Sequence, residues 1–239
     1  MHILGVRIDD FGEKEVLEKC KSAIAGGKKL FISTPNPEIL LLANKDENFK
    51  NILNSADINI PDGAGLRLGA KIQKKNLKHR LTGTDLMGHL AKMAEEMGLG
   101  IYLLGAEQGI ARKAGENLKK ILPKLNILGA ESGGKFENWD NRVIIEHINA
   151  VKPDILFVAL GQGRQEKWIF ENLPKLASVK IAVGVGGSFD FYSGRIPRAP
   201  KWMRRLGLEW LYRLFCEPRR IKRIFNAVII FPITCLIKK

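Results

Sequence analysis

The sequence predicts an α/β fold of Rossmann-like character: a mostly parallel sheet with helices on both faces, followed by a helical, basic and amphipathic C-terminal appendage. Short apolar runs alternate with amphipathic stretches along the first 194 residues, which is typical of strands alternating with helices in one sheet. Several runs are continuously apolar, and this indicates strands that are buried on both faces. The 24 glycines suit many tight turns between strands and helices.

The elements follow in order along the chain. Apolar runs predict six strands, at residues 29–33, 57–60, 100–104, 127–130, 154–160 and 179–185. Helical spacing of apolar residues predicts six helices between them, at residues 13–25, 37–44, 85–97, 109–122, 141–151 and 165–172. In the third helix we expect Asp85 to be the N-cap, ahead of Leu86 and Leu90 on the apolar face.

The charge of the chain is concentrated at its C-terminal end. Residues 195–239 contain twelve Lys or Arg and two acids, a net charge of +10, whereas residues 1–194 carry only +4. A boundary is expected near residues 194–200, where Gly and two Pro interrupt the pattern, so we expect a core at 1–194 and an appendage at 195–239. Because this tail also contains Trp202, Trp210 and Tyr212, it is suited to an acidic surface, either lipid headgroups or nucleic acid.

Composition and spacing exclude several classes of protein. The longest uncharged run near the C-terminus, residues 226–237, is shorter than the ~20 residues that a membrane span needs, so we expect it to dip into a bilayer without crossing it. The N-terminus does not resemble a signal peptide. The three cysteines form neither a metal spacing nor a disulfide framework, which favours a reducing, cytosolic compartment.

Cofactor and metal motifs are missing from the sequence. No GxGxxG follows the first strand and no GxxxxGK[ST] occurs, which disfavours dinucleotide oxidoreductases and P-loop enzymes. The four histidines are scattered, and no HxH, HExxH or DxD pattern is present. We therefore expect no cofactor and no metal.

Ligands of such sheets bind beyond the carboxyl ends of the strands, so the loops there are candidate site loops. Asp62, between Pro61 and Gly63, suits a general base at a fixed point, although an Asp that only caps a turn is the plainer interpretation. Thr34 and Asn36 could contact a sugar or base, but Asn36 ahead of a proline is also typical of a helix cap.

Two further features suit phosphate binding. Arg80 could pair with a diphosphate, because its planar fork matches phosphate oxygens, although a solvated surface arginine is the commoner outcome. The glycine run at 184–187 follows a strand and could bring backbone amides to a phosphate, or it could simply form a tight turn.

Taken together, these loops resemble the WecG/TagA/CpsF glycosyltransferases of bacterial cell-surface polymer synthesis. The resemblance covers nearly the whole chain and is carried by several stretches in order: residues 34–36, 61–63, 80–86, 161–168 and 184–190 in the core, and 198–200, 207–213 and 217–220 in the tail. One departure is visible at Gly163, where the family usually has proline.

The resemblance implies an inverting, metal-independent transferase at the cytoplasmic face of the membrane, attached peripherally. Its donor would be a UDP-sugar and its acceptor a polyprenyl-diphosphate-linked sugar. In the teichoic-acid branch, which this chain resembles most, N-acetylmannosamine passes to the 4-hydroxyl of lipid-linked N-acetylglucosamine. Other branches use donors such as UDP-N-acetylmannosaminuronate, and the sequence does not fix the donor or the oligomeric state, so a homo-oligomer stays open.

The resemblance also implies roles for individual residues. Asp62 matches the catalytic base, and Thr34, Arg80 and Gln165 match residues that support it. The matching stretches place the expected substrate-binding residues at Asn36, Thr82, Thr84, Asp85, Gly184, Gly186, Gly187, Arg213, Arg220 and Arg223. An inverting displacement needs one base and positive charge for the leaving group, and without a metal motif the arginines must supply that charge.

Two other classes of function are compatible with parts of the sequence. In a nucleic-acid-binding protein, Trp202, Trp210 and Tyr212 of the basic tail would stack on bases. The many large aliphatic residues of the tail and the lack of a known motif argue against this, so we expect no nucleic-acid partner. Retention of Asp62 argues against a non-catalytic scaffold.

Overall fold

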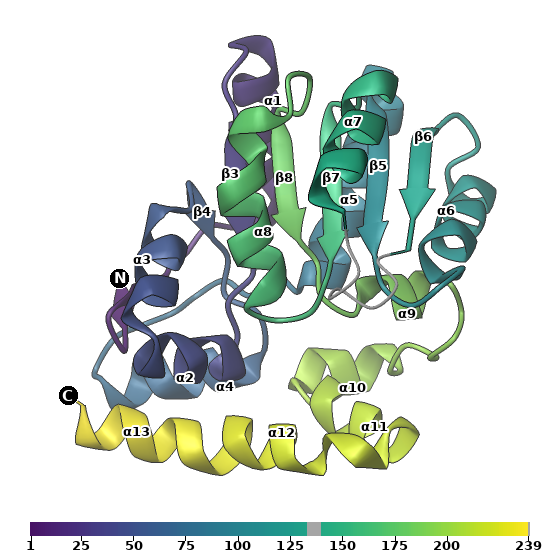
Figure 1. The fold of residues 1–239 in the computed structure, drawn as a ribbon. Coiled ribbons are helices and arrows are strands. Elements are labelled where there is room, and N and C mark those ends of the chain that lie inside the picture. The colour runs from purple at the N-terminus through teal and green to yellow at the C-terminus, as the bar shows by residue number, and fades with distance from the viewer. Residues whose placement is uncertain (133–139, 239) are drawn as a thin grey trace.

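A six-stranded parallel sheet forms the centre of the molecule, and all its strands point toward the C-terminal helices (Figure 1). The computed structural model describes residues 1–132 and 140–238. The strand order is β4-β3-β8-β7-β5-β6, and every pair of neighbours is parallel. The strands are β3 (Leu30–Ser33), β4 (Ile58–Asn59), β5 (Gly100–Gly105), β6 (Asn126–Glu131), β7 (Ile155–Ala159) and β8 (Ile181–Gly184). All six predicted strands are confirmed.

Nine helices of the described core surround the sheet. They are α1 (Glu13–Ala25), α2 (Pro37–Lys45), α3 (Glu47–Ser55), α4 (Ala64–Ile72), α5 (Gly83–Met97), α6 (Ile110–Ile121), α7 (Asn141–Val151), α8 (Arg164–Asn172) and α9 (Ser188–Tyr192), with a 3-10 turn η2 (Leu173–Lys175) after α8. The six predicted helices are confirmed within two residues at each end. The helices α3, α4 and α9 were not predicted, and neither was the antiparallel hairpin of β1 (His2–Ile3) and β2 (Val6–Arg7).

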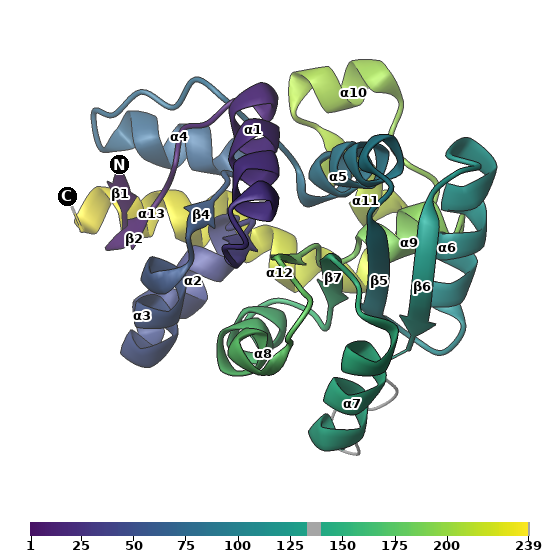
Figure 2. The same cartoon turned by 90° about the horizontal axis from the view of Figure 1, so that it is seen from above.

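The sheet is covered on both faces, as predicted (Figure 2). Alternate residues of a strand point to opposite faces. In β5, Ile101 and Leu103 pack in a buried cluster with α1, α5 and α6, whereas Tyr102 and Leu104 pack in a second cluster with α3, α7 and α8. This double coverage explains why the strands read as continuously apolar runs.

The start of α5 corrects one prediction. Asp85 is not the N-cap: the helix begins at Gly83 and is capped by Thr82, whose Oγ1 accepts a hydrogen bond of 3.1 Å from the Asp85 amide. Asp85 is the third residue of the helix, and its carboxylate accepts a hydrogen bond of 2.7 Å from the Thr82 hydroxyl. A Thr with an acidic residue three positions later forms a reciprocal capping arrangement. The N-cap of α5 therefore lies three residues earlier in the sequence than predicted.

The C-terminal segment is helical and lies across the carboxyl edge of the sheet (Figure 1). Its elements are α10 (Lys201–Leu206), α11 (Glu209–Cys216), the 3-10 turn η3 (Pro218–Arg220), α12 (Ile221–Phe225), a π-helical turn η4 (Asn226–Ile230) and α13 (Phe231–Ile237). In the described residues, no helix combines the length and the apolar character that a membrane crossing requires.

The end of the tail is anchored in the core. Phe231 and Cys235 of α13 are 0% exposed and pack in a cluster with the N-terminal hairpin, α2 and α4. The contact needs a glycine at position 69, because a Cβ there would lie 2.7 Å from the Phe231 ring. Part of the uncharged run 226–237 is therefore packed on protein, while Ile229, Ile233 and other residues of the same run stay exposed.

Candidate active site

Two adjoining pockets lie between the carboxyl edge of the sheet and the tail. The first, of about 430 Å³, is formed by the loops after β3, β5, β7 and β8 together with tail arginines. The second, of about 480 Å³, lies between the start of α4 and the helices α11 and α12. The residues that line both pockets are Asn36, Asp62, Thr84, Gln162, Arg213, Arg220 and Arg223. The site is thus at the edge where the fold class predicted it, and both core and tail contribute to it.

Asp62 occupies the wall that the two pockets share. Its loop follows β4 and is fixed at the backbone, because the Asp62 amide donates a hydrogen bond of 2.8 Å to the Pro35 carbonyl. Gly63 adopts a φ of 88°, which glycine tolerates and other residues rarely adopt. The Asp62 Oδ2 accepts a hydrogen bond of 3.3 Å from the Gly83 amide. The carboxyl group is therefore held at one point between the pockets.

The surroundings of Asp62 favour its neutral form. Burial raises the pKa of Asp62 to about 7, and the nearby carboxylates of Glu209 and Asp85 act in the same direction. The hydrogen bond from Gly83 and the charge of Arg80 oppose the rise without cancelling it. A carboxylate with a pKa near neutrality is a far stronger proton acceptor than an ordinary aspartate, which is what a general base requires.

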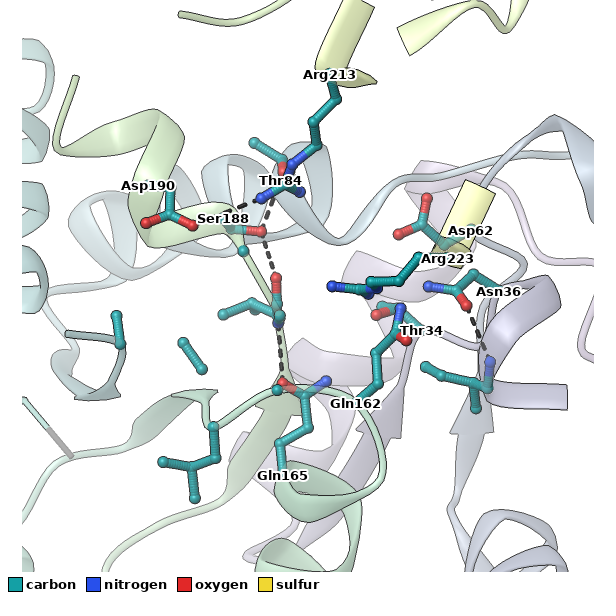
Figure 3. A pocket seen from close by; sticks show the side chains of 18 of the residues that line it. Thr34, Asn36, Asp62, Thr84, Gln162, Gln165, Ser188, Asp190, Arg213 and Arg223 are labelled. Atoms are coloured by element: carbon teal, nitrogen blue, oxygen red, sulfur yellow. Dashed lines mark hydrogen bonds and ion pairs between the residues drawn. The ribbon is translucent and has the colours of Figure 1, made fainter. Parts of the chain in front are cut away.

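Thr34 and Gln165 lie at the floor of the first pocket and shape the glycine loop (Figure 3). The Thr34 hydroxyl donates to the Gly184 carbonyl at 2.9 Å, and the Gln165 Oε1 accepts from the Gly186 amide at 3.0 Å. The Gln165 Nε2 donates to Glu166 at 2.7 Å. A Cβ at position 184 would lie 2.7 Å from the Gln165 Nε2, so glycine is required there for close approach.

The glycine loop brings the tail to the core. Gly186 has a φ of 53°. Gly187 lies against the guanidinium group of Arg213, because a Cβ at position 187 would be 2.5 Å from the Arg213 Nη2. Both glycines line the first pocket, whereas Gly184, at the end of β8, does not. The run 184–187 is therefore more than a tight turn, since its lack of side chains admits a tail arginine.

Three tail arginines point into the shared space, and carboxylates hold them there (Figure 3 shows Arg213 and Arg223). Arg213 donates to Glu217 at 2.8 Å and lies 3.5 Å from Asp190. Arg220 lies 2.7 Å from the same Glu217 oxygen. One carboxylate thus holds two guanidinium groups that would otherwise repel each other.

The third arginine connects the tail to α2. Arg223 makes a two-point contact with Glu38, with its Nε 3.0 Å from one carboxylate oxygen and its Nη2 2.7 Å from the other. Such fork-to-carboxylate pairs are among the stronger ionic contacts. Burial lowers the pKa of Arg220, and its neighbours Arg213 and Arg223 lower it further. The site therefore concentrates positive charge and is suited to an anionic ligand.

The other predicted site residues have structural contacts. Asn36 is the N-cap of α2 and accepts hydrogen bonds from the amides of Glu38 and Ile39, so the capping interpretation is right, although the residue also lines both pockets. The buried Thr84 hydroxyl lies 3.0 Å from that of Ser188.

Arg80, Thr82 and Asp85 lie on the side of the second pocket. Arg80 donates to the Arg204 carbonyl at 2.6 Å, and both it and Thr82 line only that pocket. Asp85 does not line either pocket and instead pairs with Arg198 at 2.7 Å. Arg80 and Asp85 therefore help to hold the tail against the core.

Sequence reasoning missed the carboxylates that position the arginines. These are Asp190, Glu38 and Glu217, which lie at or next to the pockets. A signal was available for Glu217, because only two acids occur among twelve basic residues of the tail. In the described part of the chain, no group of three or more His, Cys, Asp or Glu side chains is arranged to hold a metal ion.

A parallel α/β sheet with a carboxyl group of raised pKa and clustered arginines at its carboxyl edge is suited to transfer a group from or to an anionic substrate. The chain belongs to the glycosyl transferase WecG/TagA/CpsF family, whose model matches residues 1–239.

Relatives in three bacteria carry the same name, N-acetylglucosaminyldiphosphoundecaprenol N-acetyl-beta-D-mannosaminyltransferase. The Bacillus subtilis protein is 34% identical over 217 residues, which cover 91% of this chain and 80% of the relative. The Bacillus spizizenii protein is 36% identical over 199 residues, 83% of this chain and 76% of the relative. A Staphylococcus aureus protein is 33% identical over 224 residues, 93% and 87% respectively.

Proposed function

We propose that this chain transfers N-acetylmannosamine from UDP-N-acetylmannosamine to the 4-hydroxyl of undecaprenyl-diphosphate-linked N-acetylglucosamine, with inversion, in the synthesis of the wall teichoic acid linkage unit. The names of its relatives support this reaction. The observation that carries the proposal is Asp62, a carboxyl group with a pKa raised to about 7 on the wall between two pockets.

Asp62 acts as the general base in the proposed reaction. Its carboxylate takes the proton of the acceptor 4-hydroxyl while that oxygen attacks C1 of the donor sugar. The bond between C1 and the UDP oxygen breaks on the opposite face, and UDP leaves with the electron pair. Arg213, Arg220 and Arg223 stabilise the charge that develops on the diphosphate, so no divalent metal is needed.

The two pockets accommodate the two substrates. The first contains the glycine loop and Gln165 beside the three arginines that both pockets share, and we assign it to UDP and the donor sugar. The second is lined by apolar side chains, including Leu68, Trp210 and Val228, and we assign it to the acceptor and the first part of its lipid. Asp62 then lies beside the acceptor hydroxyl, whose oxygen faces the donor carbon directly, as a direct displacement requires.

The tail brings the enzyme to its lipid-linked acceptor at the cytoplasmic face of the membrane, by peripheral attachment. Exposed apolar residues, among them Trp202, Ile233 and Ile237, are carried by a segment of net charge +10. Each basic residue near an anionic surface contributes ~1 kcal/mol, and inserted apolar side chains add to it.

A UDP-release assay with a donor panel tests the proposal. The purified chain is given a short-chain lipid-diphosphate-N-acetylglucosamine acceptor and, in turn, UDP-N-acetylmannosamine, UDP-N-acetylmannosaminuronate and UDP-N-acetylglucosamine. We expect acceptor-dependent UDP release with the first donor and a β-linked product. Faster release with the uronate would assign the chain to another surface polysaccharide, and no release with any donor would contradict a transferase function.

A further inference from the structure

A third pocket lies away from the candidate active site, where the two ends of the chain meet. Its volume is about 680 Å³, and it is formed by the N-terminal hairpin, α2, α3, the end of α4 and Lys238 after α13. In both views the N-terminal hairpin and the end of α13 lie on the same side of the molecule (Figures 1 and 2). Four lysines, Lys50, Lys74, Lys75 and Lys238, line it, and we call it the lysine pocket. Among the described residues that line it there is no Asp or Glu.

The lysine pocket keeps most of its positive charge unneutralised. The Lys75 amine donates to the His2 carbonyl at 2.6 Å, and the Lys238 amine donates to the Asn44 side-chain oxygen at 2.8 Å. These partners fix the amines in place but carry no negative charge. Only Lys50 has an ionic partner in the described chain, Glu47 at 2.6 Å, and this Glu is mostly exposed. Four lysines that line a hollow with so little counter-charge are suited to bind an anion.

The backbone of the pocket supports the same interpretation. Lys74 follows the end of α4 with a φ of 56°, a left-handed conformation in which helices usually have glycine. The lysine at this position accepts backbone strain, and it lines the pocket. Strained non-glycine positions tend to gather at binding sites.

The position of the pocket indicates where the anion comes from. Lys238 follows Leu236 and Ile237 directly, and these two side chains are 53% and 78% exposed. On the opposite face of the same helix, Phe231 and Cys235 are buried against the core, so the rotation of α13 is fixed. The lysine pocket therefore borders the apolar surface that the end of α13 presents to solvent.

We propose that the lysine pocket binds the phosphate group of an anionic phospholipid headgroup. This inference rests on the peripheral attachment proposed above, and it adds a specific contact to it. The bound phosphate fixes the tilt of the molecule on the membrane, because the pocket lies beyond α13 whereas the site arginines lie on α11, η3 and α12 of the same tail.

Vesicle co-sedimentation of the full-length chain tests the proposal at ~0.15 M salt. The pocket variant Lys50→Gln/Lys74→Gln/Lys75→Gln is compared with a control, Lys92→Gln/Lys119→Gln/Lys120→Gln, which removes the same charge from α5 and α6. On phosphatidylglycerol vesicles we expect the pocket variant to lose at least tenfold in partition coefficient and the control less than threefold. An equal loss in both variants would overturn the proposal.

Additional variants separate the possible causes of a loss of vesicle binding. A Lys→Arg version of the pocket variant keeps the charge and should bind as the unmodified chain does, provided that all variants melt at a similar temperature. If Ile233→Asp abolishes vesicle binding while the pocket variant binds normally, the result supports peripheral attachment and refutes headgroup binding in the lysine pocket. If the unmodified chain itself does not bind phosphatidylglycerol vesicles, both the peripheral attachment and the lysine-pocket proposal are refuted.

Soluble glycerol 3-phosphate distinguishes a lipid from a free phosphate. We expect no saturable binding below ~10 mM by calorimetry, because an isolated phosphate lacks the apolar contacts of the neighbouring surface. Saturable binding that disappears in the pocket variant, together with unchanged vesicle partition, would assign the pocket to a soluble phosphate and overturn the lipid assignment.

Discussion

Asp62 combines two properties at the scale of the residue: a fixed position and a raised pKa. Its position comes from backbone contacts with Pro35 and Gly83, and its pKa from burial and from Glu209 and Asp85. The sequence alone supplied only a carboxylate between proline and glycine, which suits a turn cap equally well. Burial and the distant Glu209 raise the pKa of this residue, and no local pattern contains that information.

Replacing Asp62 by Asn should remove the base and leave the pocket intact, because the amide has nearly the same shape. We expect turnover to fall by ~10² or more, with an unchanged melting temperature and UDP affinity. Single-turnover UDP release, combined with calorimetric titration of UDP, measures both. Turnover within threefold of the unmodified chain would refute the assignment.

The pH dependence follows from the pKa of Asp62. Protonated Asp62 cannot accept a proton, so kcat/KM should rise with pH up to about 7, the pKa to which burial raises this group, and level off above it. Glu209→Gln removes a charge that raises this pKa and should move the midpoint to lower pH. The control Glu146→Gln, on the remote helix α7, should leave it in place, and a midpoint near pH 4 in the unmodified chain would contradict the account.

At the scale of the element, the sequence pattern predicted the regular parts well and the interactions between them poorly. The six strands were found because both faces of the sheet are covered, which makes them continuously apolar. The helix α3 was missed because its three buried residues, Phe49, Ile52 and Leu53, lie among Asn, Lys and Glu. The prediction of Asp85 as the N-cap of α5 is wrong because the pattern alone does not identify its reciprocal pair with Thr82.

In the tail, too, the elements could be predicted better than the interactions between them. Its charge and its helical character could be read from the sequence, and its three arginines matched the family, but the bounds of its helices were not predicted. The way in which Glu217, Asp190 and Glu38 hold those arginines could not be read, because these contacts join segments far apart in the chain.

The anchoring of α13 can be tested through Phe231. Phe231→Ala should lower the free energy of unfolding by ~3–5 kcal/mol, because it removes a fully buried aromatic side chain and leaves a cavity beside Gly69. The control Phe225→Ala, in a residue that is 52% exposed, should change it by less than ~1 kcal/mol. Urea denaturation measures both, and equal effects would show that α13 is not part of the core.

At the scale of the whole molecule, core and tail form one site. The core supplies Asp62, Thr34 and Gln165, and the tail supplies Arg213, Arg220 and Arg223. This division accounts for the concentration of charge at the C-terminal end, since the same segment lies over the site and presents apolar residues to the outside.

The proposal that arginines take the place of a metal ion can be tested directly. We expect activity to persist in excess EDTA and not to rise with Mg²⁺ or Mn²⁺, because guanidinium groups stabilise the leaving diphosphate. Steady-state UDP release with and without the chelator measures this. Loss of activity on chelation with rescue by either cation would contradict it.

The most direct test of the shared site is turnover on a water-soluble acceptor, where membrane attachment has no role. The variant Arg213→Gln/Arg220→Gln/Arg223→Gln is compared with Arg205→Gln/Arg219→Gln/Lys222→Gln, which removes the same charge from tail residues that line neither of the two active-site pockets. The account predicts a loss of at least ~10²-fold in the first variant and less than threefold in the second. Equal activity of the two variants, close to that of the unmodified chain, would show that the tail is only an anchor.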